Sequence, residues 1–294
     1  MNHQIFRPNY NYKPKLYFVT TFIITYALWF AGAYVSHHDD RNGLYMLFML
    51  PGLMAPFLLS VAMIATSKNS NLKKDYLNRL FNPGLIQLKM LPVILFVMPL
   101  SVLASIVLSL PFGGSVSQFQ FAEGFSFSSG FVPVLLLLLL AASFEELGWR
   151  GYAFDSLQSR YNIFWASLVF SIFWSLWHLP LIFVNNSYQY EIFHQNIWYG
   201  VNFFVSIIPM GIIISWVCIK NRKSIIAAIL FHFIINMSQE ILAMSQATKC
   251  IETAVLTVVA AVIVLLNKEC FFHKKHSVSR NPSYKSVCSL DYRC

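Results

Sequence analysis

The chain has 294 residues, of which 57% are hydrophobic and 11% are charged, with a formal net charge of +9. Soluble globular domains carry about 25% charged residues. This chain therefore has too few charged groups to cover the surface of a soluble globule, and its mean hydropathy of +0.58 predicts a protein that faces lipid.

Eight apolar stretches follow one another along the chain, and each is close to the length of about 20 residues that crosses a bilayer. They cover residues 16–36, 43–66, 85–112, 130–149, 161–184, 197–219, 224–245 and 251–267. The sequence therefore predicts an all-α, polytopic membrane bundle of about eight transmembrane helices. We expect residues 1–267 to form this bundle as one domain and the basic residues 268–294 to form a disordered tail.

The basic residues lie on one side of the predicted bundle. Of the 21 Lys and Arg residues, all but Arg41 and Lys249 fall in the two terminal segments or in connections on the same side. By the positive-inside rule, this pattern predicts a multi-pass protein of the cell membrane with both termini in the cytoplasm. It also explains the positive charge through contact with the lipid bilayer, without nucleic acid as a partner.

Ionisable side chains near or inside the apolar stretches are the candidates for function, because a charge at a helix centre costs at least about 2.5–3.5 kcal/mol. Glu145 and Glu146 stand side by side near the end of the fourth stretch. Glu146 can pair with Arg150, four residues later on the same helix face. Glu145 is rotated by about 100° from Glu146, so it faces a different neighbour and stays free to accept a proton.

Two histidines extend this set to three helices. His178 lies in the fifth stretch and His232 in the seventh, where His232 shares a helix face with Asn236 and with Glu240 one turn further on. Taken singly, each group has a simpler interpretation: snorkelling glutamates, packed histidines, hydrogen bonds between helices, and tryptophans that serve packing or the membrane interface. Three helices that each carry such a group favour a shared site in the bundle core.

Three motifs in order carry a resemblance to a known family. The motifs Glu145-Glu146-x-x-x-Arg150, aromatic-x-x-x-His178 and His232-x-x-x-Asn236 resemble the signature of the CPBP (Abi) family. That family comprises type II CAAX prenyl endopeptidases and bacteriocin-processing or self-immunity intramembrane proteases. The motifs fall within a catalytic core of about residues 130–245. The aromatic residue here is Trp174 where the family usually has Phe, which we interpret as a tolerated exchange.

The resemblance implies an intramembrane endopeptidase of eight helices that cuts a peptide or membrane-protein substrate. It also implies a role for each motif residue: Glu145 activates a water that His178 helps to position, His232 and Asn236 stabilise the oxyanion, and Glu146 pairs with Arg150. These roles suit peptide hydrolysis, which needs an activated water and hydrogen-bond donors aimed at the developing negative charge.

A zinc-dependent mechanism is the alternative chemistry. In that case Glu145, His178 and His232 would hold the metal, as His and Glu ligands do in other peptidases. The chain lacks the His-Glu-x-x-His pattern of such enzymes, so a mechanism without metal or other cofactor is favoured and Zn²⁺ stays open.

Two other functions also stay open. The first is a non-catalytic immunity or regulatory protein of the same fold. The second, less favoured, is a transporter, because the sequence shows no inverted repeat with matched Gly- or Pro-broken spans.

The predicted spans place the motif residues at different depths. Glu145 lies about 8 Å from the cytoplasmic end of its stretch and His178 about 26 Å from the same end of the next, at 1.5 Å per residue. The two can meet only if the fifth span starts deeper, tilts, or follows a helix over residues 151–162.

Overall fold

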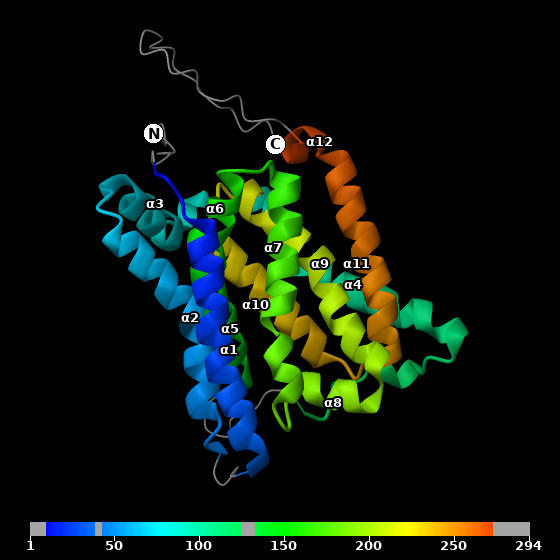
Figure 1. Cartoon of the computed structure of the whole chain (residues 1–294). Helices are drawn as coiled ribbons and strands as arrows, with labels where there is room; N and C mark the ends of the chain where they lie inside the picture. Colours follow the sequence, from blue (N-terminus) through cyan, green and yellow to red (C-terminus); the bar gives the residue numbers. More distant parts are fainter. Residues whose placement is uncertain (1–9, 39–42, 125–132, 273–294) are drawn as a thin grey trace.

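The computed structural model describes residues 10–38, 43–124 and 133–272, and these form a bundle of helices (Figure 1). The main helices are α1 (Pro14–His38), α2 (Met46–Thr66), α3 (Ser70–Phe81), α4 (Leu91–Ser109), α5 (Val134–Gly148), α6 (Phe154–Gln158), α7 (Ile163–Trp177), α8 (Tyr188–Gln195), α9 (Ile197–Lys220), α10 (Ile225–Ile241), α11 (Gln246–Leu266) and α12 (Lys268–Phe272). Within the described ranges the β structure is limited to one bridge between Phe121 and Leu242. The all-α prediction is confirmed.

Each of the eight predicted spans corresponds to one helix, but the count of eight is not confirmed. Six segments of the described chain are long and apolar enough to cross a membrane: those of α1, α2, α4, α7, α9 and α11. The other two are shorter, since α5 has 15 residues and α10 has 17. α10 ends early because Leu242 adopts an extended conformation and pairs with Phe121.

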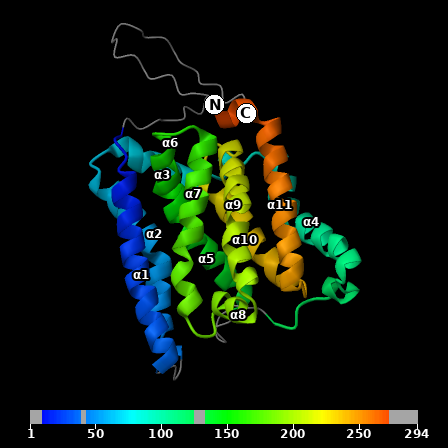
Figure 2. The same cartoon turned by 45° about the vertical axis from the view of Figure 1, so that its right-hand side comes forward.

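The bundle has two different ends (Figures 1 and 2). The α3 end contains α3, α6, α12 and the start of α1, whereas the α8 end contains α8, the end of α1 and the turn between α10 and α11. The described basic residues gather at the α3 end: Lys13, Lys15, Lys68, Lys73, Lys74, Arg79, Lys89, Arg160, Lys220, Arg222, Lys223 and Lys268. Among the described residues, Lys249 is the one Lys or Arg at the α8 end.

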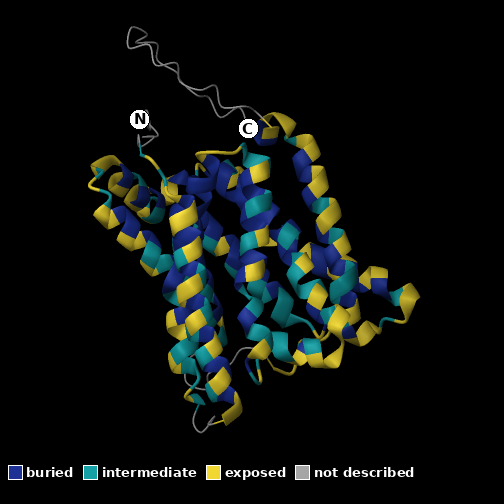
Figure 3. Ribbon diagram, in the orientation of Figure 1, coloured by how far each residue is buried: buried dark blue, intermediate teal, exposed yellow. Residues whose placement is uncertain are grey.

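The outer surface of the helices is apolar, as lipid contact requires. Ile23 and Val258 are 64% and 63% exposed, and the outer faces of α1 and α11 carry many exposed residues (Figure 3). Small polar residues lie inside instead. Ser105 of α4 and Ser171 of α7 are fully buried, and each donates to the carbonyl four residues earlier, which satisfies its hydroxyl without water.

The helix that carries the two glutamates does not end at Gly148. It continues through a π-helical turn, Trp149–Ala153, into α6, so the helical run spans residues 134–158. A Cβ on Gly148 would lie 2.5 Å from the backbone carbon of Pro56, so glycine allows α5 to touch α2 there. π-Helical turns occur frequently at functional sites, and this one directly follows Glu145 and Glu146.

This continuation resolves the difference in depth that the sequence predicted. The end of α6 at Gln158 lies about 20 Å below Glu145 along the axis, and the start of α7 at Ile163 lies about 22 Å below His178, at 1.5 Å per residue. The predicted helix over residues 151–162 is therefore present over residues 151–158, and it brings the two motif residues to one level.

The C-terminal boundary differs from the prediction. Residues 268–272 form α12, and Phe271 is fully buried, so the bundle extends five residues beyond the predicted boundary at 267. A large aromatic side chain that packs on the bundle explains this order. The rest of the predicted tail, residues 273–294, lies outside the described residues.

Candidate active site

Glu146 is fully buried and lies between the side chains of Arg150 and His232. Its Oε2 is 3.1 Å from Nη1 of Arg150, and its Oε1 accepts from Nδ1 of His232 at 2.9 Å. Arg150 also donates to the hydroxyl of Ser215 at 3.3 Å, and its guanidinium lies 4.2 Å from the centre of the Phe170 ring. The Glu146–Arg150 pair thus has the geometry that its spacing predicted, and helices α5, α7, α9 and α10 meet around it.

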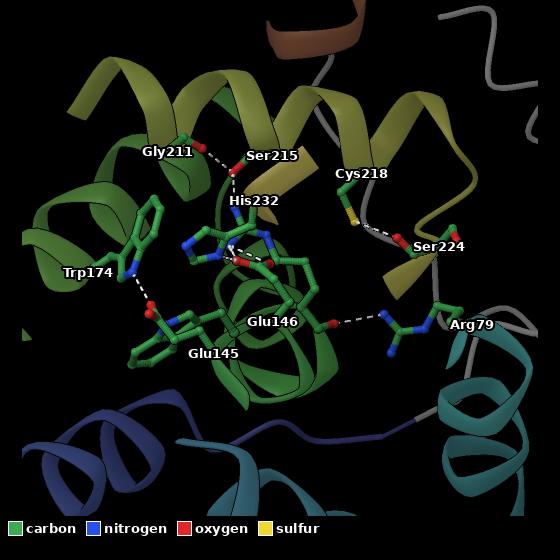
Figure 4. Close-up of polar contacts among 11 residues, drawn as sticks. Arg79, Glu145, Glu146, Trp174, Gly211, Ser215, Cys218, Ser224 and His232 are labelled. Carbon is green, nitrogen blue, oxygen red and sulfur yellow. Dashed lines mark hydrogen bonds and ion pairs between the residues drawn. The ribbon is translucent and has the colours of Figure 1, made fainter. Parts of the chain in front are cut away.

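Glu145 lies on the opposite side of the same helix turn, and its partners are indoles (Figure 4). Its Oε2 accepts from Nε1 of Trp174 at 2.6 Å and from Nε1 of Trp149 at 3.3 Å. No Lys or Arg in the described ranges forms an ion pair with this carboxylate. The side chain is therefore held in place by neutral donors while its charge stays uncompensated by a cation.

Trp174 corrects the interpretation of the tryptophans as packing or interface residues. Its indole N–H makes the shorter of the two hydrogen bonds to Glu145, which Phe could not make. The sequence offered one signal for this role: a buried indole needs an acceptor, and Trp174 stands four residues before His178 on the same helix face. Trp149 and Ser215 were missed in the same way, because their partners come from the tertiary fold.

The two histidines are each held in place through the same ring nitrogen, Nδ1. Nδ1 of His178 lies 2.8 Å from the carbonyl oxygen of Trp174, and Nδ1 of His232 lies 2.9 Å from Glu146. Because a carbonyl or carboxylate oxygen accepts, each Nδ1 carries the hydrogen in these contacts. Nε2 of each ring is therefore the nitrogen available for chemistry.

A cavity of about 430 Å³ joins these groups to the α8 end. At its inner end it is lined by Glu145, Trp174, His178, His232 and Asn236. One wall is apolar and is formed mainly by α2 and α5, with Met46, Met49, Leu50, Leu53, Leu138 and Ala141. The facing wall is polar, and Glu240 belongs to it. All six predicted site residues thus lie at or directly behind one cavity, with Glu146 and Arg150 in the layer behind.

A cluster of ion pairs lies between the site and the α3 end of the bundle. Arg79 lies 2.9 Å from Asp75 and 3.0 Å from Asp155, and Lys223 lies 2.5 Å from Asp155. Burial opposes the charge of Arg79, but Asp155 and Asp75 outweigh it and raise the pKa of its guanidinium. Burial also raises the pKa of Asp75, and Arg79 offsets this only in part.

Arg79 connects the cluster to the glutamate helix. Its guanidinium donates to the carbonyl oxygen of Arg150 at 3.0 Å (Figure 4). It also donates to the carbonyl oxygen of Gly151 at 3.3 Å, and both carbonyls belong to the π-helical turn. A π-helical turn interrupts the regular backbone ladder, so these carbonyls need other donors. Arg79 supplies them from α3.

No three side chains of His, Cys, Asp and Glu gather closely enough to hold a metal ion in the part of the chain that the structure describes. The three residues named for Zn²⁺, Glu145, His178 and His232, line the same cavity without forming such a cluster. The donor set as arranged does not fit a zinc site, and no step is derived through a metal.

Comparison with known proteins matches this site to one family. Residues 127–238, which contain every motif residue, match the family model described as type II CAAX prenyl endopeptidase Rce1-like. The chain is also 68% identical over 266 residues to the "CAAX prenyl protease 2" of Methanococcus maripaludis. The aligned region covers 90% of this chain and 98% of the relative. The chain belongs to the type II CAAX prenyl endopeptidase family. It is a membrane peptidase, and the predicted intramembrane endopeptidase activity is confirmed at this level.

Proposed function

We propose that the chain hydrolyses a peptide bond with a water that Glu145 activates. The observation that carries this proposal is the contrast between two adjacent glutamates: Glu146 is paired with Arg150 and contacts His232, whereas Glu145 faces the cavity with indole partners. Both indoles donate to Oε2 of Glu145. Oε1 is therefore the oxygen that takes the proton from water as the water attacks the substrate carbonyl carbon.

His178 positions this water. Its Nδ1–H is engaged by the carbonyl of Trp174, so Nε2 accepts a hydrogen bond from the water. The water is then held by two acceptors, Glu145 and His178, with one lone pair directed at the substrate. General-base assistance of this kind contributes about 10²–10⁴-fold to the rate.

His232 and Asn236 stabilise the tetrahedral oxyanion. As an imidazolium, His232 keeps its Nδ1–H on Glu146 and offers Nε2–H to the oxyanion, and the Asn236 amide on the next turn of α10 supplies a second donor. Glu146 and Arg150 fix the ring of His232. The protonated Glu145 then passes its proton to the leaving amine.

The substrate class follows from the apolar wall of the cavity and from the family. A peptide whose cysteine near the C-terminus carries an isoprenyl group would place this lipid against Met49 and Leu53 of α2 and Leu138 of α5. The scissile bond would then lie at Glu145, and the residues that follow it would lie along the polar wall.

Charge distribution supports an orientation in the cell membrane with both termini in the cytoplasm. The α3 end holds the described basic residues apart from Lys249 and the buried Arg150, so it would face the cytoplasm. Residues of α8 line the cavity, so we infer that the substrate would reach it from the opposite face. An epitope tag after residue 294 should then bind antibody only in permeabilised cells; labelling of intact cells would reverse the orientation.

The catalytic proposal is tested with Glu145→Gln. The purified protein is given a peptide with a farnesylated cysteine four residues from its C-terminus, flanked by a fluorophore and a quencher. We expect cleavage by the wild type and a loss of about 10²–10⁴-fold in kcat for the variant. Glu191→Gln, which changes an exposed glutamate of α8, should keep full activity.

Three results would contradict the proposal. Activity retained in Glu145→Gln would remove the role of Glu145. Failure of the wild type to cut the farnesylated peptide, while it cuts an unmodified one, would remove the lipid from the substrate class. Inactivation by a chelator with recovery on addition of Zn²⁺ would replace the metal-free mechanism.

A further inference from the structure

The outer part of the cavity, at the α8 end, contains polar groups that the proposed hydrolysis does not use. Lys249 donates to the hydroxyl of Tyr188 at 3.1 Å and lies 4.8 Å from the centre of its ring. The Tyr188 hydroxyl donates onward to Oε1 of Gln246 at 3.0 Å. Beside them, Gln239 of α10 donates to Glu252 of α11 at 2.6 Å. All five residues line the cavity.

Lys249 is the one Lys or Arg that lines this cavity, and it has no carboxylate within ion-pair distance in the described residues. An ammonium has three hydrogens to donate, and the Tyr188 hydroxyl takes one of them. The half-buried cation therefore keeps donor capacity toward the cavity. A tyrosine ring and hydroxyl hold it there, and Glu252, one turn further along α11, acts on it only from beyond ion-pair distance.

Neither helix stability nor membrane topology explains a lysine at this place. Lys249 lies in the first turn of α11, where the positive end of the helix dipole disfavours a cation. It is also the one described basic residue at the α8 end, so it opposes the charge bias that orients the bundle. A ligand of opposite charge would account for its position.

The spacing along α10 and α11 gives the size of that ligand. Along α10, the rise from His232 to Gln239 is about 10 Å. Gln239 contacts Glu252 of α11, and Lys249 lies about 4.5 Å further toward the α8 end along α11. An extended peptide spans about 3.3–3.6 Å per residue. Three residues beyond the scissile bond would bring a terminal carboxylate to within reach of the lysine side chain.

We propose that the Lys249 ammonium binds the C-terminal carboxylate of the substrate, on the side of the peptide released by cleavage. This assignment rests on the proposed endopeptidase function and adds the feature that selects the chain end. Tyr188 positions the ammonium. Glu240 lies on the same wall and repels a carboxylate that is displaced from Lys249, which limits cleavage to a bond at one distance from the terminus.

The test uses two farnesylated peptides that differ only at the end, one with a free carboxylate and one with an amide. A hydrogen bond to a charged group stabilises by about 1.5–3 kcal/mol, so the wild type should favour the acid by roughly 10–100-fold in kcat/KM, mainly through KM. Lys249→Met should lose this preference by slowing cleavage of the acid while leaving the amide unchanged. Lys249→Arg should keep it.

Lys268→Met is the matched control, because it removes an exposed lysine at the other end of the bundle and should change neither substrate. Equal cleavage of acid and amide by the wild type would overturn the Lys249 assignment, and so would an equal loss on both peptides in Lys249→Met. Failure of the wild type on both peptides would instead contradict the proposed function, so the two failures are distinguishable.

Discussion

The two ends of the bundle differ in how their charged side chains are paired. At the α3 end, Arg79, Asp75, Asp155 and Lys223 form a closed cluster in which every charge has a partner. At the α8 end, the cavity wall combines amides and hydroxyls with Glu240 and Glu252, and its one lysine forms no ion pair among the described residues. Buried charges are tolerated when they are paired, so the α3 end provides stability and the α8 end provides binding capacity.

Glu145 and Glu146 stand at the boundary between these two halves. One helix position separates them, which turns their side chains about 100° apart. Glu146 belongs to the paired half through Arg150, and Glu145 belongs to the cavity. A chain can thus place a structural acid and a reactive acid next to each other without mixing their environments.

The largest expected effect compares Glu146→Gln with Glu145→Gln. Glu146→Gln leaves the buried Arg150 without its carboxylate, and breaking a buried pair from one side costs about 3–5 kcal/mol. Glu145→Gln keeps a carbonyl oxygen for both indoles, so it should cost less than about 1 kcal/mol. Thermal unfolding in detergent, followed by tryptophan fluorescence, measures both. Equal shifts in Tm would show that the two carboxylates share one environment.

The second effect lies at the α3 end. Arg79→Ala leaves Asp75 without its cation, leaves Asp155 with Lys223 alone, and removes the donors to the π-helical turn, so we expect a loss of about 3 kcal/mol in the free energy of unfolding. Cleavage should also slow, because Arg150 belongs to that turn. Lys74→Ala, an exposed lysine of α3, should change neither Tm nor activity. An unchanged rate in a folded Arg79→Ala protein would separate the cluster from the active site.

The third effect concerns the indole donors to Glu145. Trp174→Phe keeps an aromatic ring but removes the 2.6 Å hydrogen bond, so kcat should fall by roughly 10–100-fold with little change in Tm. Trp177→Phe is the matched control, because its indole donates to Thr25 instead. It should lower Tm and leave kcat intact. A similar loss of kcat in both variants would show that Trp174 acts through packing and not through its hydrogen bond to Glu145.

The sequence predicted the helices and the local pairs because both depend on spacing along one element. Apolar length located the helices, six of which are long enough to span a membrane in the described chain, and the interval of four residues located the Glu146–Arg150 contact. It also singled out His178 and His232, because an ionisable side chain is costly inside an apolar stretch.

The partners contributed by distant segments could not be predicted in this way. Arg79 contacts a carbonyl 71 residues later, and its local i,i+4 pair with Asp75 does not predict that contact. The extent of α5 was underestimated for a related reason, since its continuation through residues 149–158 is polar enough to look like a connection. In the folded chain these polar groups are paired with α3 and α9, which allows the helix to continue.

The smallest expected effect is the pH dependence of the α3 end. Burial raises the pKa of Asp75 above the ordinary aspartate value of 3.8, so the folded state binds this proton more tightly than the unfolded state. Stability from this group is therefore present at low pH and declines as the pH rises from about 4 through the raised pKa. Asp75→Asn should remove that decline.

The difference in Tm between wild type and Asp75→Asn, followed from pH 4 to pH 7, isolates this contribution, because all other groups titrate in both proteins. We expect the difference to change by a few °C at most, given that a shift of about 1 kcal/mol moves Tm by roughly 2–4 °C in a chain of this size. A decline of Tm with pH that is the same in both proteins would assign it to other groups. The ion pair with Arg79 would then compensate the burial of the Asp75 charge fully, and Asp75 would not lower the stability of the folded chain in that pH range.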